Sequence, residues 1–322
     1  MSLKVVKLSK RYNDKWVLRD VSFEVADGEI YGLFGPLGAG KTTLLDAMQG
    51  NTSTNGGSVF YRDTDVTTLG RAARRFRSPE AVHATILERF LKSDNSFSKA
   101  ERDLAAISSA IDSAENVLFL DESFCGMNFR EFESITAKLR ETVRERGLSV
   151  IFASNNFEQI MIASDRAAVI INGGIEQIGA PKDIYESPES RVVAEVTGRN
   201  NLFAARRLTS SKADTPEFHT IDGGHRLFTQ RVERAGLGAL NQNVTLAIRP
   251  EQISISFGAS FPEDNLLKAI VTRVQFLGAT TLIDLDAGGL NLQALVLRLV
   301  GLNVGDECMV GLPPDRIQIF KD

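Results

Sequence analysis

The chain has 322 residues, of which 43% are hydrophobic and 24% charged, which is ordinary for a globular protein of about two domains. A formal net charge of −4 gives no reason to expect nucleic acid as a partner, and two cysteines, Cys125 and Cys308, are too few for a disulfide framework and fit a reducing compartment. The opening MSLKVVKLSKRY lacks a signal-peptide layout and no apolar run is long enough to span a bilayer, so we expect any membrane role to depend on docking to a protein that does span it.

The chain opens with two predicted strands, Leu3 to Leu8 and Val17 to Val25. Tyr12 and Trp16 are expected in the connection between them. An aromatic ring at this place can stack on a nucleotide base, or it can simply cover the edge of a sheet. The residues alone leave both interpretations of Tyr12 open.

A glycine-rich turn then joins a buried strand, Glu29 to Phe34, to a helix that runs to Gly50. The turn has the Walker A pattern, in which a glycine and four further residues precede Gly-Lys-Thr. Glycines let backbone N–H groups face phosphate oxygens, and the helix directs its positive end at the same anion. Lys41 is predicted to bind the β and γ phosphates of ATP, and the Thr42 hydroxyl to hold Mg²⁺. The predicted nucleotide-binding residues are Gly35, Pro36, Leu37, Gly38, Ala39, Gly40, Lys41, Thr42 and Thr43.

The stretch from Thr67 to Asp94 is rich in arginine. We interpret it as a solvated basic face that includes a helix from Glu80 to Lys92. A second helix is predicted from Ser98 to Ser113, with Ser98 and Glu101 forming a capping box.

An apolar run from Val117 to Leu120 ends in Asp121 and Glu122. This is the Walker B layout, in which a buried parallel strand presents acids at its carboxyl end. Asp121 is predicted to hold Mg²⁺, and Glu122 to polarise the attacking water as a general base. The alternative, an acidic start of the next helix, is disfavoured by the Walker A pattern earlier in the chain.

Strands and helices alternate as far as about residue 200, which predicts a mainly parallel sheet. Beyond this point short strand-like runs recur between glycine and acidic turns, without an internal sequence repeat, and predict a small all-β barrel or sandwich. We therefore expect an α/β nucleotide-binding domain over residues 1–200 and a β domain over residues 201–322. The predicted strands of the second domain are Val244 to Ile248, Leu266 to Phe276, Thr281 to Leu285, Leu290 to Leu297, Glu307 to Gly311 and Arg316 to Phe320.

Taken together, the two Walker motifs and the β tail resemble the ATP-binding subunit of an ABC transporter, in the importer group that handles sulfate, ferric iron, polyamines or sugars. The stretches that carry this resemblance are KRYNDKWVLRDVSFEVADGE, SDRAAVIINGGIEQIGAPKDIYESPESRVVAEVTGRNNLF, AIRPE and VQFLGATT. The resemblance implies a P-loop NTPase core of the ABC ATPase type, followed by an OB-like regulatory barrel. It also assigns Tyr12 as the aromatic that stacks on adenine.

The chain departs from the family pattern at several motifs. The signature Leu-Ser-Gly-Gly-Gln is replaced by residues 97–101, Phe-Ser-Lys-Ala-Glu. The family's switch motif, Thr-His-Asp, is replaced by Ser154-Asn155-Asn156. Asn155 therefore stands at the catalytic position of the histidine, but an asparagine cannot become cationic as a histidine can. Gly126-Met127-Asn128 lacks the usual aspartate. The segment from Lys41 to Phe97 is several dozen residues shorter than in the family, and the missing part should hold the glutamine loop and most of the helical subdomain.

The resemblance implies a peripheral subunit on the cytoplasmic face of the inner membrane that binds ATP and Mg²⁺. Its implied partners are integral membrane permease subunits, a second ATP-binding subunit and, indirectly, a periplasmic or extracellular solute-binding protein, with no role for nucleic acid. The damaged motifs favour slow or partner-dependent hydrolysis and a heterodimer over a homodimer. The alternative is a regulatory ATP-binding module that does not itself drive transport.

Overall fold

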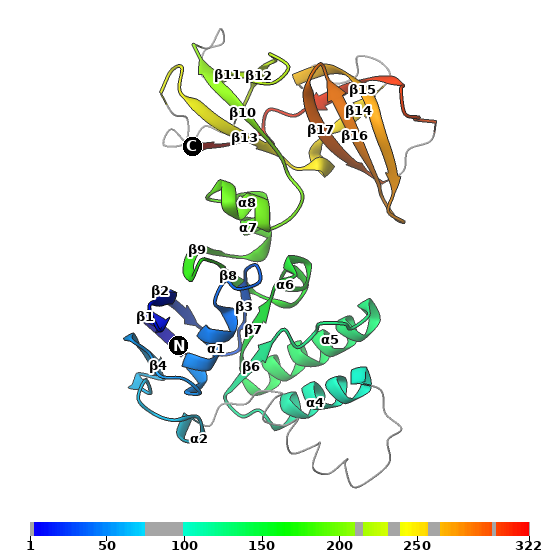
Figure 1. Cartoon of the computed structure of the whole chain (residues 1–322). Coiled ribbons are helices and arrows are strands. Elements are labelled where there is room, and N and C mark those ends of the chain that lie inside the picture. The colour runs from blue at the N-terminus through cyan, green and yellow to red at the C-terminus, as the bar shows by residue number, and fades with distance from the viewer. Residues whose placement is uncertain are drawn as a thin grey trace. The chain divides into compact units, whose positions relative to one another are not determined.

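The computed structural model describes residues 3–74, 99–209, 215–230, 239–256, 265–297 and 301–321. They form two compact units, Met1–Glu189 and Ser190–Asp322 (Figure 1). The predicted helix from Glu80 to Lys92 lies outside the described residues, as do Phe97 and Ser98. Within the described ranges, no helix combines the length and the apolar character needed to cross a bilayer.

The first unit is built on a five-stranded sheet in the order β6-β7-β3-β8-β9. Strands β6, β7, β3 and β8 run parallel, and β9 pairs antiparallel with β8, so the mainly parallel sheet is confirmed. Nearly every residue of β3 and β7 is buried, because helices cover both faces of such a sheet. The strands are β3 Ile30–Phe34, β6 Val117–Asp121, β7 Ser149–Ser154, β8 Arg166–Ile171 and β9 Gly174–Gly179.

A second, antiparallel sheet of the same unit has the order β2-β1-β4-β5. Its strands are β1 Leu3–Tyr12, β2 Lys15–Val25, β4 Gly56–Tyr61 and β5 Thr64–Asp65. The expectation that Tyr12 and Trp16 lie in a connection is wrong, since both residues belong to paired strands. Only Asn13 and Asp14 separate these strands, and Asn13 takes the positive φ of 52° that a tight hairpin turn requires.

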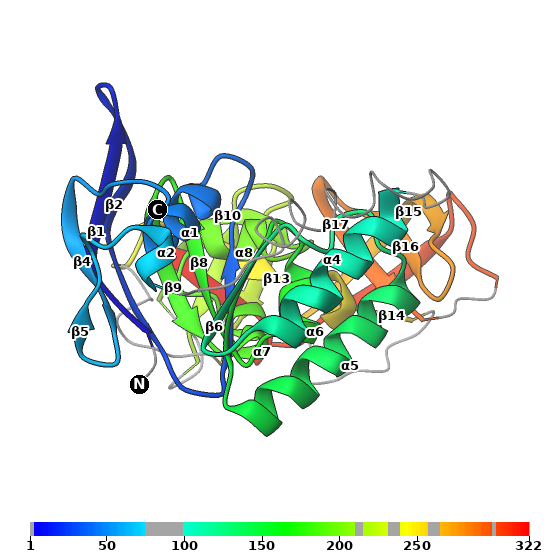
Figure 2. The ribbon, with the colours of Figure 1, turned by 90° about the horizontal axis from the view of Figure 1, so that it is seen from below.

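The helices of the first unit pack between and around the two sheets. The apolar face of α1 is buried in a core shared with strands of both sheets. Helices α4 and α5 lie side by side in both overall views (Figures 1 and 2). The Lys138 ammonium of α5 is 2.8 Å from a carboxylate oxygen of Asp112 on α4. The helices are α1 Lys41–Gln49, α2 Arg71–Arg74, α4 Lys99–Ser113, α5 Phe129–Arg146, α6 Phe157–Ala163 and α7 Pro181–Glu186.

Arg74 contradicts the solvated basic face expected for this stretch, because its side chain is only 5% exposed. Its guanidinium donates to the carbonyl oxygens of Ala47 and Met48, the last turn of α1, and to those of Thr67 and Leu69. A helix ends with carbonyl groups that have no intrahelical partner, and a planar guanidinium with five N–H groups satisfies several of them at once. Burial lowers the pKa of Arg74 from its ordinary value. Arg74 therefore fixes the end of the helix that begins at the Walker A lysine.

In its described residues, the second unit contains helix α8 and two five-stranded antiparallel sheets, which confirms the β-strands expected for the C-terminal region. One sheet has the order β12-β11-β10-β13-β19 and the other β14-β18-β15-β16-β17. The two sheets share one apolar core. The elements are α8 Arg191–Val196, β10 Asn201–Leu208, β11 Glu217–Thr220, β12 Arg226–Phe228, β13 Asn243–Ile248, a 3₁₀ turn at Pro250–Gln252, β14 Ser254–Ser256, β15 Asn265–Phe276, β16 Thr281–Ala287, β17 Leu290–Val296, β18 Glu307–Leu312 and β19 Gln318–Lys321.

The second unit is a structural duplication, although no repeat was expected from the sequence. Strands β10 to β13 and β15 to β18 have the same pairing order, and each half passes its last strand, β14 or β19, to the sheet of the other half. The first strand of each half begins with a buried asparagine, Asn201 or Asn265. Only a faint sequence signal accompanies the duplication, such as Asn-Leu at 201 and 265 and Gly-Gly at 223 and 288.

The two asparagines make the same contacts. Asn201 Nδ2 donates to the carbonyls of Ile248 and Gln293, at 3.2 and 2.9 Å, and Asn201 Oδ1 accepts from the Gln293 N–H. Asn265 Nδ2 donates to the carbonyls of Phe228 and Leu312, at 3.0 and 2.9 Å, and Asn265 Oδ1 accepts from the Phe228 N–H. Each side chain thus satisfies backbone groups on an edge strand of the opposite sheet, β17 or β12.

Candidate nucleotide-binding site

The Walker A loop lies between the end of β3 and the start of α1. Gly40 has a φ of 104°, and a Cβ at this position would lie 2.9 Å from the Val17 carbonyl oxygen, so only glycine fits. Gly40, the N-cap residue of α1, has no side chain that could accept from the N–H groups of the first turn. An uncapped N-terminus of this kind favours an anion at this end of a helix.

The Lys41 ammonium connects the two Walker motifs. Its side chain is 6% exposed, and Nζ donates to the carbonyl oxygens of Gly35, at 2.7 Å, and Pro36, at 3.3 Å. The same nitrogen lies 3.2 Å from Glu122 Oε1. Strand β7 separates β3 from β6 in the sheet, yet their carboxyl ends bring the lysine and the carboxylate together, as expected at the ligand-binding edge of an open α/β sheet.

Glu122 lies between the Walker A lysine and the switch segment. Its backbone takes a φ of 45°, a conformation that costs free energy in a residue with a side chain and is often found at functional sites. Its N–H donates to the Ala153 carbonyl at 2.9 Å, and its Oε2 accepts from the Asn155 N–H at 3.3 Å. The structure thus brings Asn155 to Glu122 through the backbone, while the Asn155 side chain is exposed.

The two predicted magnesium ligands lie at the start of α1 and at the end of β6. Thr42 is an exposed residue of the first turn of α1, and Asp121, half-buried, is the last residue of β6. Among the described residues, no group of three or more His, Cys, Asp or Glu side chains could hold a metal ion by itself. A hydroxyl and one carboxylate suit Mg²⁺, which is usually bound by one or two protein oxygens together with phosphate oxygens and water.

Tyr12 lies at the hairpin end of β1 and is 47% exposed. The Lys10 ammonium lies 4.9 Å from the centroid of its ring, a cation–π contact. Val17, near the start of β2, contacts the Walker A loop at Gly40. The adenine-stacking role of Tyr12 stays a prediction.

One part of the site was visible in the sequence only as a turn. The N–H of Gly173, between β8 and β9, donates to the carbonyl oxygen of Ala39 in the Walker A loop, at 3.1 Å. The Gly173 carbonyl accepts from the Arg19 N–H on β2, at 2.8 Å. Through these two hydrogen bonds, the turn between β8 and β9 links the Walker A loop to β2.

The loops that depart from the family pattern are described in part. Of the signature segment, the backbone is described from Lys99, the first residue of α4, and the side chains of residues 99–103 lie outside the description. Asn128, in place of the usual aspartate, caps α5: its Oδ1 accepts from the Glu131 N–H and its N–H donates to Glu131 Oε2, both at 3.0 Å. The side chain is therefore engaged within its own helix.

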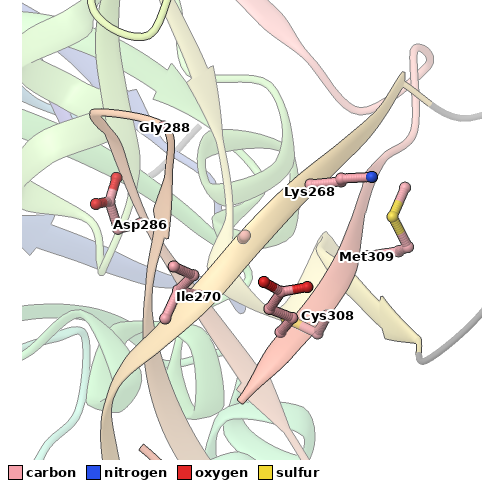
Figure 3. A pocket seen from close by; sticks show the side chains of 8 residues that line it. Lys268, Ile270, Asp286, Gly288, Cys308 and Met309 are labelled. Atoms are coloured by element: carbon pink, nitrogen blue, oxygen red, sulfur yellow. The ribbon is translucent and has the colours of Figure 1, made fainter. Parts of the chain in front are cut away.

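A pocket of about 450 Å³ opens on the second unit (Figure 3). Ile270 on β15 pairs with Asp286 on β16 and with Glu307 on β18, so these side chains form a row on the outer face of the sheet. Lys268 lies two residues from Ile270 on the same face. The lining residues are Lys268, Ala269, Ile270, Asp286, Gly288, Glu307, Cys308 and Met309.

Comparison with known families agrees with this arrangement. Residues 18–88 match the model of the ABC transporter family, and residues 246–320 match that of the TOBE domain. The chain is 24% identical to the molybdate/tungstate import ATP-binding protein WtpC of Pyrococcus horikoshii, over 99% of each chain.

Solved structures show the same fold. The ADP conformation of MJ1267, an ATP-binding cassette of an ABC transporter, is 19% identical with a TM-score of 0.51, covering 61% of this chain and 97% of that one. A nucleotide-free ATP-binding cassette from an ABC transporter is 18% identical with a TM-score of 0.52, covering 62% and 99%. With the two family matches, these findings show an ABC ATPase fold followed by a TOBE domain, in a chain that is similar along its whole length to an import ATP-binding protein.

Proposed function

We propose that this subunit binds Mg-ATP at the Walker A loop and hydrolyses it slowly, or only with a partner. The observation that carries the proposal is the position of the Lys41 ammonium, held by two loop carbonyls and 3.2 Å from Glu122. In this proposal the ammonium binds the β and γ phosphates of a triphosphate at the uncapped end of α1. Thr42 and Asp121 supply the oxygens for Mg²⁺, whose chemistry is to neutralise charge on the phosphates.

In this proposal Glu122 accepts a proton from the attacking water and Asn155 orients the γ-phosphate region by hydrogen bonding alone. A histidine at position 155 could carry positive charge, and asparagine cannot. Loss of one contact to the transition state typically lowers the rate about a hundredfold or more. The altered signature at residues 97–101 removes a second set of contacts. Binding without efficient turnover is therefore expected from the isolated chain.

Import ATP-binding subunits work with membrane permeases, and we place this chain on the cytoplasmic face of the inner membrane beside such subunits. A distinct ATP-binding subunit with an intact signature is the favoured partner, because it would supply the contacts that residues 97–101 lack. A solute-binding protein on the outer side would deliver the cargo. Molybdate and tungstate are the cargo to test first, because the full-length relative is named for their import.

Calorimetry with Mg-ATP tests the core of the proposal. We expect association of one ATP per chain and a large loss of affinity in Lys41→Ala, with Lys182→Ala as a control for a surface lysine outside the site. ATPase activity is then compared between the isolated chain and the assembly purified from native membranes. Turnover that appears only in the assembly supports partner dependence. Brisk turnover by the chain alone contradicts it, and the absence of heat with ATP contradicts the site itself.

A second function, a regulatory ATP-binding module that does not drive transport, is favoured by the pocket at Ile270. In this pocket the Lys268 ammonium and the carboxylates of Asp286 and Glu307 surround apolar side chains, which suits a small charged ligand. The volume of the pocket is within the range of ligand pockets. Co-purification distinguishes the two functions. Recovery of integral membrane subunits with the chain supports transport. A separate uptake assay is made in cells that lack this chain, and solute uptake that persists there supports the regulatory role.

A further inference from the structure

Gln159, a half-buried residue of α6, joins two loops of the site. Its Oε1 accepts from Ser154 Oγ at 2.8 Å, and its Nε2 donates to the carbonyl oxygen of Phe124 at 3.4 Å. Ser154 is the last residue of β7, and its Oγ also accepts from the Asn156 N–H at 3.0 Å. The side chain therefore spans from the switch segment to the loop that follows Glu122.

The loop reached by Gln159 is closely tied to the predicted general base. Phe124 follows Glu122 by two residues, and its ring packs on Phe132 of α5 and Phe152 of β7, with centroid distances of 5.2 and 4.9 Å. The Cys125 N–H donates to the Glu122 carbonyl at 3.1 Å, so Glu122 and the loop form one hydrogen-bonded turn. A shift of the Phe124 carbonyl would consequently move the Glu122 backbone.

Besides the backbone bond from the Glu122 N–H to the Ala153 carbonyl, two connections that involve side chains join the ends of β6 and β7. One is the exposed bond from the Asn155 N–H to Glu122 Oε2, which involves the reacting carboxylate itself. The other is the Gln159 bridge, which involves groups away from the reacting atoms and ends on the buried Ser154 and Phe124. When ATP binds and Glu122 exchanges Lys41 for water, the bond from the Asn155 N–H to Glu122 Oε2 breaks if the carboxylate moves. The Gln159 bridge does not involve the carboxylate and persists.

We infer that Gln159 is a positioning residue, which keeps the Glu122 loop in register with the switch segment through hydrogen bonds to Ser154 and Phe124. This inference rests on the proposed nucleotide site but concerns a contact present without nucleotide. It can therefore be tested in the unliganded chain as well as in turnover.

Cys125 is a natural reporter for the loop. It is exposed and adjoins Phe124, whereas Cys308, the other cysteine, is buried. In the unliganded full-length chain we expect a thiol reagent to modify Cys125 about two- to tenfold faster in Gln159→Met than in the parent, the range that corresponds to the loss of one net hydrogen bond. Gln159→Glu keeps an acceptor for Ser154 but loses the donor to Phe124, so it should match Gln159→Met.

Two further variants make the test specific. Ser154→Ala should also accelerate modification, and combining it with Gln159→Met should add little, because both changes break the same bridge. Met161→Ala, on an exposed position of α6, is the control and should react like the parent chain. The inference is overturned if Gln159→Met reacts at the parent rate, or if Met161→Ala changes the rate as much as Gln159→Met does.

Turnover by the subunit or its assembly provides the second measurement. In Gln159→Met we expect kcat to fall about tenfold with the KM for Mg-ATP within about twofold, because Gln159 acts on the position of Glu122 and not on nucleotide binding. A rise in KM with kcat unchanged overturns the inference. If the parent assembly shows no turnover, the hydrolytic part of the proposed function fails, and the Cys125 rates still decide whether the bridge holds the loop.

Discussion

The ion pair between Lys41 and Glu122 should compete with ATP, and Glu122→Gln tests this directly. The lysine side chain is 6% exposed and that of the glutamate 31%, with 3.2 Å between Nζ and Oε1. Phosphates that take up the Lys41 ammonium must displace the carboxylate. Because the pair belongs to the nucleotide-free protein, removing one charge should destabilise that state and favour the ATP-bound one.

The size of the effect follows from the burial of the pair. Breaking a fully buried pair costs about 3–5 kcal/mol, and an exposed pair contributes about 0–1 kcal/mol. With one partner buried and the other about a third exposed, and with two loop carbonyls still accepting from Lys41, we expect about 1–2 kcal/mol. The dissociation constant for Mg-ATP should fall by about five- to thirtyfold, since about 1.4 kcal/mol corresponds to a factor of ten.

The assay combines calorimetry with denaturant unfolding. The free energy of unfolding of the nucleotide-free first unit should fall in Glu122→Gln by about as much as the binding free energy for Mg-ATP improves. Glu133→Gln, an exposed change on α5, should alter neither quantity. An unchanged or weaker affinity for ATP in Glu122→Gln would refute the reasoning, whatever happens to hydrolysis.

Three further outcomes are expected. Arg74→Met should lower the unfolding free energy of the first unit by about 3 kcal/mol in urea titration, because four carbonyl groups lose a charged donor, and a loss below about 1 kcal/mol would contradict the structural role of Arg74. Asn201→Ala and Asn265→Ala should lower the melting temperature of the second unit by similar amounts, since both asparagines make equivalent contacts, and clearly unequal shifts would argue against the duplication. Burial raises the pKa of the Cys308 thiol, which keeps this thiol protonated. At pH 8 a thiol reagent should therefore modify the exposed Cys125 first, and Cys308 only at higher pH or after unfolding. Mass spectrometry that finds both cysteines modified equally fast would contradict this.

The sequence predicts the fold class and the central part of the site because both depend on local patterns. Apolar runs such as residues 117–120 report burial on both faces of a sheet, and glycines around Lys41 report a backbone that approaches an anion. Since the carboxyl ends of parallel strands share one edge, placing Lys41 near Glu122 requires no more than the two motifs. The structure puts them 3.2 Å apart.

Contacts between distant segments could not be predicted in this way. Arg74 looks like any surface arginine until the end of α1, more than 20 residues earlier, supplies its acceptors. Asn201 meets a partner 92 residues away. Gln159 lies on a short helix whose sequence gives no sign of a link to Phe124, 35 residues before it. A single sequence carries no record of which polar side chain reaches which backbone group, so tertiary folding decides these roles.

The exchange of strands β14 and β19 between the two halves of the second unit has a practical consequence for expressing parts of this protein. Cleaving the chain between the halves would leave each fragment without its own closing strand and carrying the one that belongs to its neighbour. Neither fragment should be soluble on its own, whereas the two expressed together should reassemble. Strand β19, Gln318–Lys321, completes the sheet built by the first half, so removing these few residues should expose β13, its pairing partner more than seventy positions upstream.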